Sequence, residues 1–240
     1  MIEKLQKMQF IIFALIIVSG LLIATKFVTG SLSRDGISVT GSAYKIVKSD
    51  SGKLSFNIKV QAPTKAEAYK IMKNQLPQVE KYLNEKGITS IEIKNYHGYY
   101  NYKYNSVARM HTNEVESYNL SQPIEIVSND VNKIKEISLD IQNLLEKNID
   151  ININQTSYFY SKLSDLKVEL LELATIDSMQ RASAMLKATN NKVGKIQSVK
   201  MGVFQITEVD STNVSDMGIN DTSTIDKKVT AVANVVFKIK

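Results

Sequence analysis

The side chains best able to do chemistry in this chain are two histidines and several carboxylates. His97 lies in Tyr96-His97-Gly98-Tyr99, a sequence typical of a turn or hairpin tip, and His111 is followed by Glu114 and Glu116. A zinc ion needs three or four ligands at recognised spacings, and these residues do not provide them. We therefore predict no metal site and no other cofactor.

A second group of carboxylates, Glu169, Glu172 and Asp177, falls within one predicted helix. Paired carboxylates can act as general acid and general base, although such acids more often form a solvated helix face. The chain contains no cysteine and no nucleotide-binding, serine-hydrolase or metalloprotease motif. We predict that the protein is not an enzyme, and an envelope hydrolase that uses Glu169 or Asp177 is the least favoured alternative.

Four tyrosines are the candidate partner-binding residues: Tyr96, Tyr100, Tyr102 and Tyr104. Their even-numbered positions place them on one face of a predicted strand, because side chains alternate between the two faces of a sheet. One interpretation is a strip that binds sugar or peptide. The favoured interpretation is that these amphipathic rings cover a sheet at a subunit contact or near its edge.

Residues 1–30 form a membrane anchor or a secretion signal. Residues 10–23 carry no charge and follow Lys4 and Lys7, and the apolar run extends from residue 8 to residue 28. A helix of about 20 residues crosses a hydrocarbon core of about 30 Å. We favour an uncleaved transmembrane helix over a cleaved signal, because no clear small-residue cleavage pattern follows. The predicted anchor residues are Phe10, Ile11, Ile12, Phe13, Leu15, Ile16, Ile17, Leu21, Leu22 and Ile23.

The orientation of this anchor follows from its position near the start of the 240-residue chain. A short basic head usually stays in the cytoplasm, so the body is expected on the other side of the membrane. The absence of cysteine from a body in an oxidising compartment favours a bacterial envelope over a eukaryotic surface. We predict a single-pass protein of the bacterial inner membrane, with its body in the periplasm or otherwise outside the cytoplasmic membrane.

The net charge of +6 is a weak guide to partners. Residues 1–34 account for half of it, with four basic residues and one acid. No basic stripe with interleaved aromatic residues is visible in the body. Nucleic-acid binding is therefore not predicted.

Hydrophobic periodicity predicts an α+β body in the order β-β-α-β-β-α-β-α-β-β, with a mixed or antiparallel sheet and about three helices. One helix begins at a Thr64–Glu67 capping box, is kinked at Pro77 and ends at Gly87. The next helix is capped by Ser128 or Asn129, and residues 210–226 read as a mobile loop. The strands are expected at 37–41, 53–61, 88–104, 112–127 with an interruption at Pro123, 149–160, 196–209 and 229–239.

The third helix, at about 164–189, repeats Leu170, Ala174, Ser178, Ala182 and Leu186 at intervals of four. Residues four apart share a helix face. The three small residues in the middle predict that the helix axis approaches a sheet or another helix closely.

Three segments in this order resemble the SIMPL domain family, which was first described as a domain of unknown function. Ile37-Ser38-Val39-Thr40-Gly41 resembles the family's opening strand, residues 177–196 resemble its helix with a following Gly-Lys, and residues 229–239 resemble its closing strand. Ser178 in place of alanine, Asn190 in place of glycine and Ser117-Tyr118 in place of Gly-Tyr depart from the family pattern. The resemblance implies one extracytoplasmic domain over residues 37–240.

The family resemblance also implies a function carried by surfaces, because the family has no established catalytic site. Its members include envelope proteins that assemble into rings or larger homo-oligomers, with a link to oxidative-stress defence. The leading hypothesis is a non-enzymatic, membrane-anchored scaffold that contacts lipid through its N-terminal helix. The alternative is an extracytoplasmic module that captures a ligand or an envelope protein through its tyrosine-rich hairpin.

Overall fold

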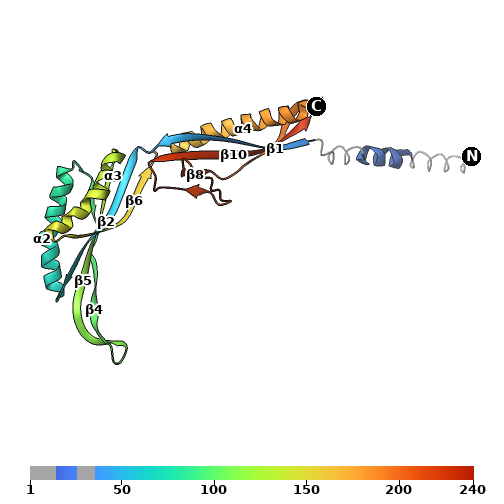
Figure 1. The fold of residues 1–240 in the computed structure, drawn as a ribbon. Helices are drawn as coiled ribbons and strands as arrows, with labels where there is room; N and C mark the ends of the chain where they lie inside the picture. The colour runs from blue at the N-terminus through green and yellow to red at the C-terminus, as the bar shows by residue number, and fades with distance from the viewer. Residues whose placement is uncertain (1–14, 26–35) are drawn as a thin grey trace, which may run out of the picture. The chain divides into compact units, whose positions relative to one another are not determined.

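The structure is a computed structural model that describes residues 15–25 and 36–240. The chain divides into two compact units. Unit 1 comprises residues 1–41, 176–200 and 234–240, and unit 2 comprises residues 42–175 and 201–233. The elements are shown in Figure 1 and are described below within their own units.

The main sheet of unit 2 is antiparallel and has the order β3-β5-β2-β6, with β4 also paired to β5. Its central strand β2 (Ser51–Ala62) pairs with residues 118–128 of β5 on one side and with β6 on the other. The remaining strands are β3 (Ile91–Ile93), β4 (His97–Asn105), β5 (Met110–Ser128) and β6 (Asp150–Phe159). The prediction of antiparallel strands is confirmed for this sheet.

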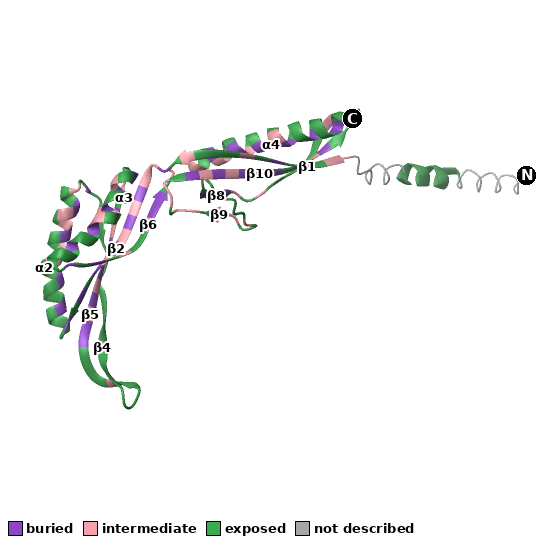
Figure 2. Ribbon diagram, in the orientation of Figure 1, coloured by how far each residue is buried: buried purple, intermediate pink, exposed green. Residues whose placement is uncertain are grey.

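Helices cover one face of this sheet, as the buried residues in Figure 2 indicate. Leu54, Phe56 and Ile58 alternate along β2 and are fully buried, whereas the residues between them are half-buried or exposed. Helix α2 (Lys65–Glu85) packs on β2 and β5, and helix α3 (Val131–Asp140) packs on β2, β5 and β6. This period-2 pattern is the one that the sequence predicted for a half-buried strand.

The predicted start of α2 is confirmed. The backbone N–H of Glu67 donates to the Thr64 hydroxyl, which in turn donates to the Glu67 carboxylate. The helix is continuous through Pro77, and Gly87 beyond its end has a φ of +76°, the left-handed region in which glycine is favoured.

The cap of α3 differs from the prediction. Asp130 is the N-cap and accepts from the backbone N–H groups of Asn132 and Lys133. Ser128 instead accepts from the backbone N–H of Asp130. After α3 the chain continues as a 3-10 helix, η1 (Ile141–Lys147), which ends at Asn148 with a φ of 58°.

The second sheet has the order β1-β10-β8-β9, with β7 also paired to β10. Strand β8 is antiparallel to β10 and parallel to β9, so this sheet is mixed. Its strands are β1 (Gly36–Lys48), β7 (Val193–Met201), β8 (Gln205–Glu208), β9 (Ile219–Asn220) and β10 (Asp226–Ile239). Helix α4 (Leu163–Lys187) precedes β7, and its small residues Ala174, Ser178 and Ala182 are fully buried.

Three of the strand predictions are wrong in detail. The expected strand 196–209 is two strands, because the chain leaves the β7 ladder after Met201 and Gly202 bonds to the carbonyl of Val232. The expected strand 88–104 is also two strands, β3 and β4. Pro123 does not interrupt β5, because it lies opposite the gap between β3 and β4, where its carbonyl accepts from Lys94.

Part of the predicted anchor lies outside the described residues, including Phe10, Ile11, Ile12 and Phe13. Residues 15–25 form a helix whose large apolar side chains are each between 54% and 66% exposed. No helix within the described part of the chain is long and apolar enough to cross a membrane.

Candidate functional site

The candidate site is a two-stranded arm of unit 2, defined as residues 97–117. It consists of β4, the turn at 106–109 and the first part of β5. Residues 110–117 of β5 pair with β4 but lie beyond the register of β2, and Figure 1 shows this hairpin running out from the rest of its sheet. A two-stranded ribbon has no covering layer of its own and is marginally stable alone in water.

The tip of the arm is built by local hydrogen bonds. The side-chain oxygen of Asn105 accepts from the backbone N–H groups of Val107 and Ala108, and Arg109 takes a φ of 52° before β5 begins. Asn at the start of a turn favours this geometry. The turn therefore holds Val107, which is 94% exposed, at the end of the arm.

One face of the arm is aromatic. Tyr100, Tyr102 and Tyr104 alternate along β4 opposite Tyr118, Val115 and His111, respectively. The rings of Tyr100 and Tyr118 meet edge to face at 4.8 Å, and the ring of Tyr104 lies 5.2 Å from that of His111. Even so, the three β4 tyrosines remain between 42% and 58% exposed. Such a row of rings is suited to contact with another surface.

The opposite face of the arm is polar. Lys103 forms a 2.9 Å ion pair with Glu114, and the Asn101 amide donates to the hydroxyl of Ser117. The register also slips between Asn101 and Tyr104, so β5 carries extra residues there. Bulges of this kind bend a ribbon and increase its twist. The arm is therefore curved, with Tyr100, Tyr102 and Tyr104 on one face and with polar groups and Tyr99 on the other.

Tyr96 is not part of this row. It precedes β4, and its ring lies 5.8 Å from that of Tyr69 on α2. These two rings line an open cleft of about 400 Å³ together with Lys65, Ala66 and Leu120. The prediction thus grouped residues from two places, the arm and this cleft. Tyr69 was missed because its position on a helix hides its proximity to Tyr96.

The two histidines lie in strands. His97 is the first residue of β4 and pairs with Ser121, so its predicted place at a hairpin tip is wrong. The tip lies at 106–109, where Asn105 organises the turn. The Nδ1 atom of His111 lies 3.1 Å from the carbonyl oxygen of Tyr102. Among the described residues no three His, Asp or Glu side chains form a group that could hold a metal ion.

Two of the three candidate carboxylates on helix α4, Glu169 and Asp177, form ion pairs. Glu169 lies 2.9 Å from the Lys45 ammonium, and Asp177 lies 2.8 Å from the Arg181 guanidinium. Both pairs are largely exposed, and exposed pairs of this kind are ordinary features of solvated surfaces.

The comparisons with known proteins agree with the fold. The SIMPL family model, described as a protein of unknown function (DUF541), matches residues 37–237. No curated protein matches the chain. The match extends from the second residue of β1 to near the end of β10 and does not include the helix of residues 15–25. This chain therefore belongs to the SIMPL family.

Proposed function

We propose that this protein is a non-enzymatic scaffold of the bacterial cell envelope, anchored in the inner membrane and assembled with copies of itself. Its body lies on the periplasmic or outer side of that membrane, and its role is linked to stress defence. The observation that carries the proposal is the arm: a curved ribbon with an exposed row of tyrosines on one face.

The anchor is supported by the helix of residues 15–25. Its apolar side chains are exposed on all sides, which water does not favour and lipid does. Its two hydroxyl groups are satisfied within the helix, because Ser19 donates to the carbonyl of Ile16 and Thr25 to that of Leu22. Polar groups within a bilayer need such internal partners.

Deletion of residues 1–30 is expected to release the protein from membranes. The full chain should sediment with membranes, resist high salt and alkaline carbonate, and enter solution with detergent, whereas the truncated chain should stay in the soluble fraction. Fractionation followed by immunoblotting measures this. Recovery of the full-length, unprocessed chain in the soluble cytoplasmic fraction would contradict the anchor.

Assembly with copies of the same chain is supported by three properties of the arm. Its aromatic face is exposed, its tip carries Val107 and Met110 at 94% and 61% exposure, and β4 has an edge that pairs with no described strand. Exposed strand edges and apolar patches are common sites of association. Anchoring strengthens such contacts, because neighbours that share one plane meet at a raised local concentration.

Replacement of Tyr100 and Tyr102 by serine is expected to weaken the oligomer. Tyrosines at the centre of interfaces often contribute about 2 kcal/mol or more, so the dissociation constant should rise at least about 30-fold even if only one of the two rings contributes this much. Mass photometry or sedimentation of the detergent-extracted protein measures this. The control is Tyr44→Ser, which removes a more exposed tyrosine ring from β1. A monomeric wild-type chain at high concentration, or an unchanged oligomer in the double variant, would refute the proposal.

The second candidate function is a binding module, favoured by the cleft between Tyr69 and Tyr96. Its volume of about 400 Å³ lies within the range of small-ligand sites, and it combines two aromatic rings with the Lys65 ammonium. Two sets of tyrosine variants distinguish the binding module from the scaffold. A binding module with Tyr96→Ser loses its ligand or envelope partner and keeps its oligomeric state, whereas a scaffold with Tyr100→Ser and Tyr102→Ser loses the oligomer.

A further inference from the structure

We propose that the body of unit 1 (residues 36–41, 176–200 and 234–240) is a lipid-binding surface that docks on the anionic phospholipid headgroups of the leaflet from which the anchor emerges. This inference rests on the proposed anchor and adds to it a second, electrostatic contact with the membrane. The balance of basic and acidic residues differs sharply between the two units.

The described residues of unit 1 carry seven basic side chains and one acid, Asp177. Unit 2 carries 19 basic and 21 acidic residues. The whole formal excess of the chain, +6, therefore equals the excess found in the described part of unit 1. The seven cations come from two separate stretches of sequence, 176–200 and 234–240, and all are exposed: Arg181, Lys187, Lys192, Lys195, Lys200, Lys238 and Lys240.

Six of these seven cations have no carboxylate partner among the described residues. Arg181 pairs with Asp177, but none of the six lysines forms an ion pair with a described residue. In unit 2, by contrast, Lys86 bonds to both Glu136 and Asp140, and Lys94 bonds to Glu125. Unpaired lysines concentrated on one small unit produce a positive field that attracts an anionic surface.

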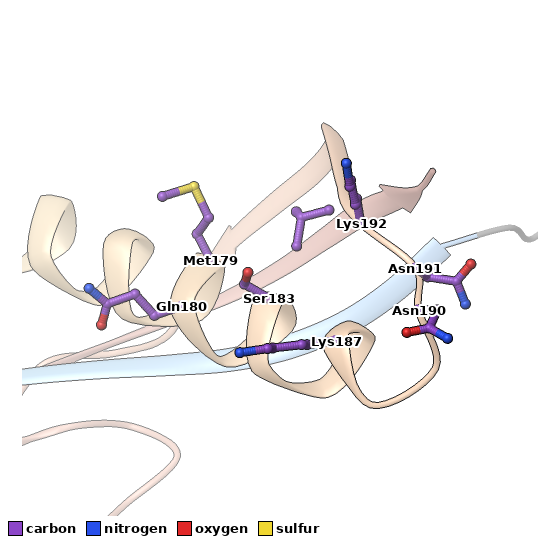
Figure 3. A pocket seen from close by; sticks show the side chains of 8 residues that line it. Met179, Gln180, Ser183, Lys187, Asn190, Asn191 and Lys192 are labelled. Carbon is purple, nitrogen blue, oxygen red and sulfur yellow. The ribbon is translucent and has the colours of Figure 1, made fainter.

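The same unit exposes apolar side chains among its lysines. The largest are Ile176, Met179, Met185, Ile196, Val199 and Ile239, each between 37% and 57% exposed. Met179, Lys187 and Lys192 line one open cleft of about 650 Å³ between α4 and the start of β7, and Figure 3 shows them together. A mixture of cationic and apolar groups suits the interface of a membrane, where lysines meet phosphates and apolar groups enter the headgroup layer. A soluble polyanion would interact with the lysines and the arginine but not with the exposed apolar side chains.

The chain connection keeps unit 1 near the bilayer. Strand β1 begins at Gly36, and ten residues separate it from the helix that ends at residue 25. Ten residues span at most roughly 35 Å even when fully extended. Gly36 also lies against Gln197 and Val236, so its end of β1 is packed among β7 and β10 of the same unit. A positive unit tethered this closely experiences the surface potential of an anionic leaflet.

The test uses the full chain in lipid nanodiscs and a single reporter cysteine. The protein has no cysteine of its own, so Ser183→Cys places one fluorophore on exposed α4 within unit 1. Quenching by spin-labelled lipid headgroups then reports contact with the bilayer. We expect stronger quenching in discs that contain phosphatidylglycerol than in purely zwitterionic discs. The difference should disappear in about 0.5 M salt, where the Debye length is only a few ångströms.

Charge variants give the matched comparison. Each lysine near an anionic surface changes the docking equilibrium about fivefold, so Lys187→Gln, Lys192→Gln and Lys195→Gln together should weaken docking on the order of 100-fold. The control is Lys70→Gln with Lys73→Gln, which removes exposed charges from α2 in unit 2. We expect the control to dock as the wild type does.

The outcomes are distinct. Quenching that does not depend on lipid charge, or that falls equally in both variants, would overturn the inference. A second contrary result is that a soluble glycerol-phosphate polymer shields the Ser183→Cys fluorophore from the quencher in zwitterionic discs, while anionic lipid has no effect on quenching. That result would overturn the inference in favour of a soluble polyanion. Failure of the chain to enter any disc would instead refute the anchor of the proposed function.

Discussion

Replacement of Gly98 by valine is expected to detach the arm from its sheet while the rest of unit 2 stays folded. A Cβ atom at Gly98 would lie 2.6 Å from the hydroxyl oxygen of Tyr118 and closer still to the carbonyl oxygen of Asn119. The Tyr118 ring could move, but the carbonyl belongs to β5, the strand on which the arm depends. A backbone atom cannot relieve this clash by changing rotamer, so the pairing between β4 and β5 must be disrupted at this point.

The size of the effect follows from overpacking. Extra methyl groups in a filled site cost about 1–3 kcal/mol where side chains can adjust, and more where backbone must shift. We expect amides of residues 97–117 to exchange with solvent on the order of 100-fold faster, which corresponds to about 3 kcal/mol. Hydrogen exchange read by mass spectrometry measures this by segment. The scaffold proposal also predicts that the variant loses its oligomer.

Tyr99→Val is the matched control for this experiment. It places the same valine at the next position of β4, on the polar face of the arm, where the present side chain is 63% exposed. Valine is favoured in strands, so the control should keep both the arm and the oligomer. If Gly98→Val exchanged and assembled as the control does, the close approach of Tyr118 and Asn119 would have no role in holding the arm.

The sequence predicted the elements whose signals are local. The alternation of Leu54, Phe56 and Ile58 predicted β2, and the Thr64–Glu67 capping box predicted the start of α2, because both signals depend on neighbours a few residues away. The family resemblance was also recognisable from the sequence, because its three segments keep their order and spacing.

The errors arose where a distant partner decided the local structure. The short strand β9 lies within residues 210–226, which were predicted to be a mobile loop, and it forms because Ile219–Asn220 pair with β8. Tyr100, Tyr102 and Tyr104 lie on one face of β4, as predicted. Tyr96 does not belong to this row, because its ring lies beside that of Tyr69 on α2. No periodicity in the sequence carries information about such a contact.

The positive charge of unit 1 also depends on contacts between distant parts of the chain. Five of its seven basic residues lie in residues 176–200 with a single acid, and the other two lie in residues 234–240. Folding brings residues 176–200 and 234–240 into one unit and leaves nearly all of the acids in the other. A scan along the chain shows each basic stretch, but it does not show that the two stretches join in one unit.

The second large effect concerns a buried ion pair in unit 2. Lys227 is only 4% exposed, and its ammonium donates to the carbonyl oxygen of Asp221 at 2.8 Å and lies 3.7 Å from its carboxylate. The carboxylate also accepts from the backbone N–H and hydroxyl of Ser223 and from the hydroxyl of Thr224. Burial opposes ionisation of Asp221, but these hydrogen bonds and the Lys227 charge together lower its pKa to about 2.

Asp221→Asn is expected to destabilise the protein by about 3–5 kcal/mol, because removal of one member of a buried pair leaves an uncompensated charge on Lys227. Burial lowers the pKa of Lys227, and Asp221 opposes that shift, so the variant should lower it further. Lys227→Met is the comparison: it removes the buried ammonium and leaves Asp221 with its Ser223 and Thr224 donors, so its cost should be smaller. The double variant should be less destabilised than the sum of the two single changes.

The pH dependence of unfolding tests the same pair with the wild-type side chains. Asp221 has a lower pKa in the folded protein than its ordinary value of 3.8, so its ionised form stabilises the fold above that value. This contribution is lost as the pH falls from about 4 toward 2. Urea unfolding at several pH values should therefore show a steeper loss of stability in the wild type than in Asp221→Asn over this interval. Parallel curves for the two proteins, or a cost of Asp221→Asn below about 1 kcal/mol at neutral pH, would mean that the pair is screened by solvent despite the burial of Lys227.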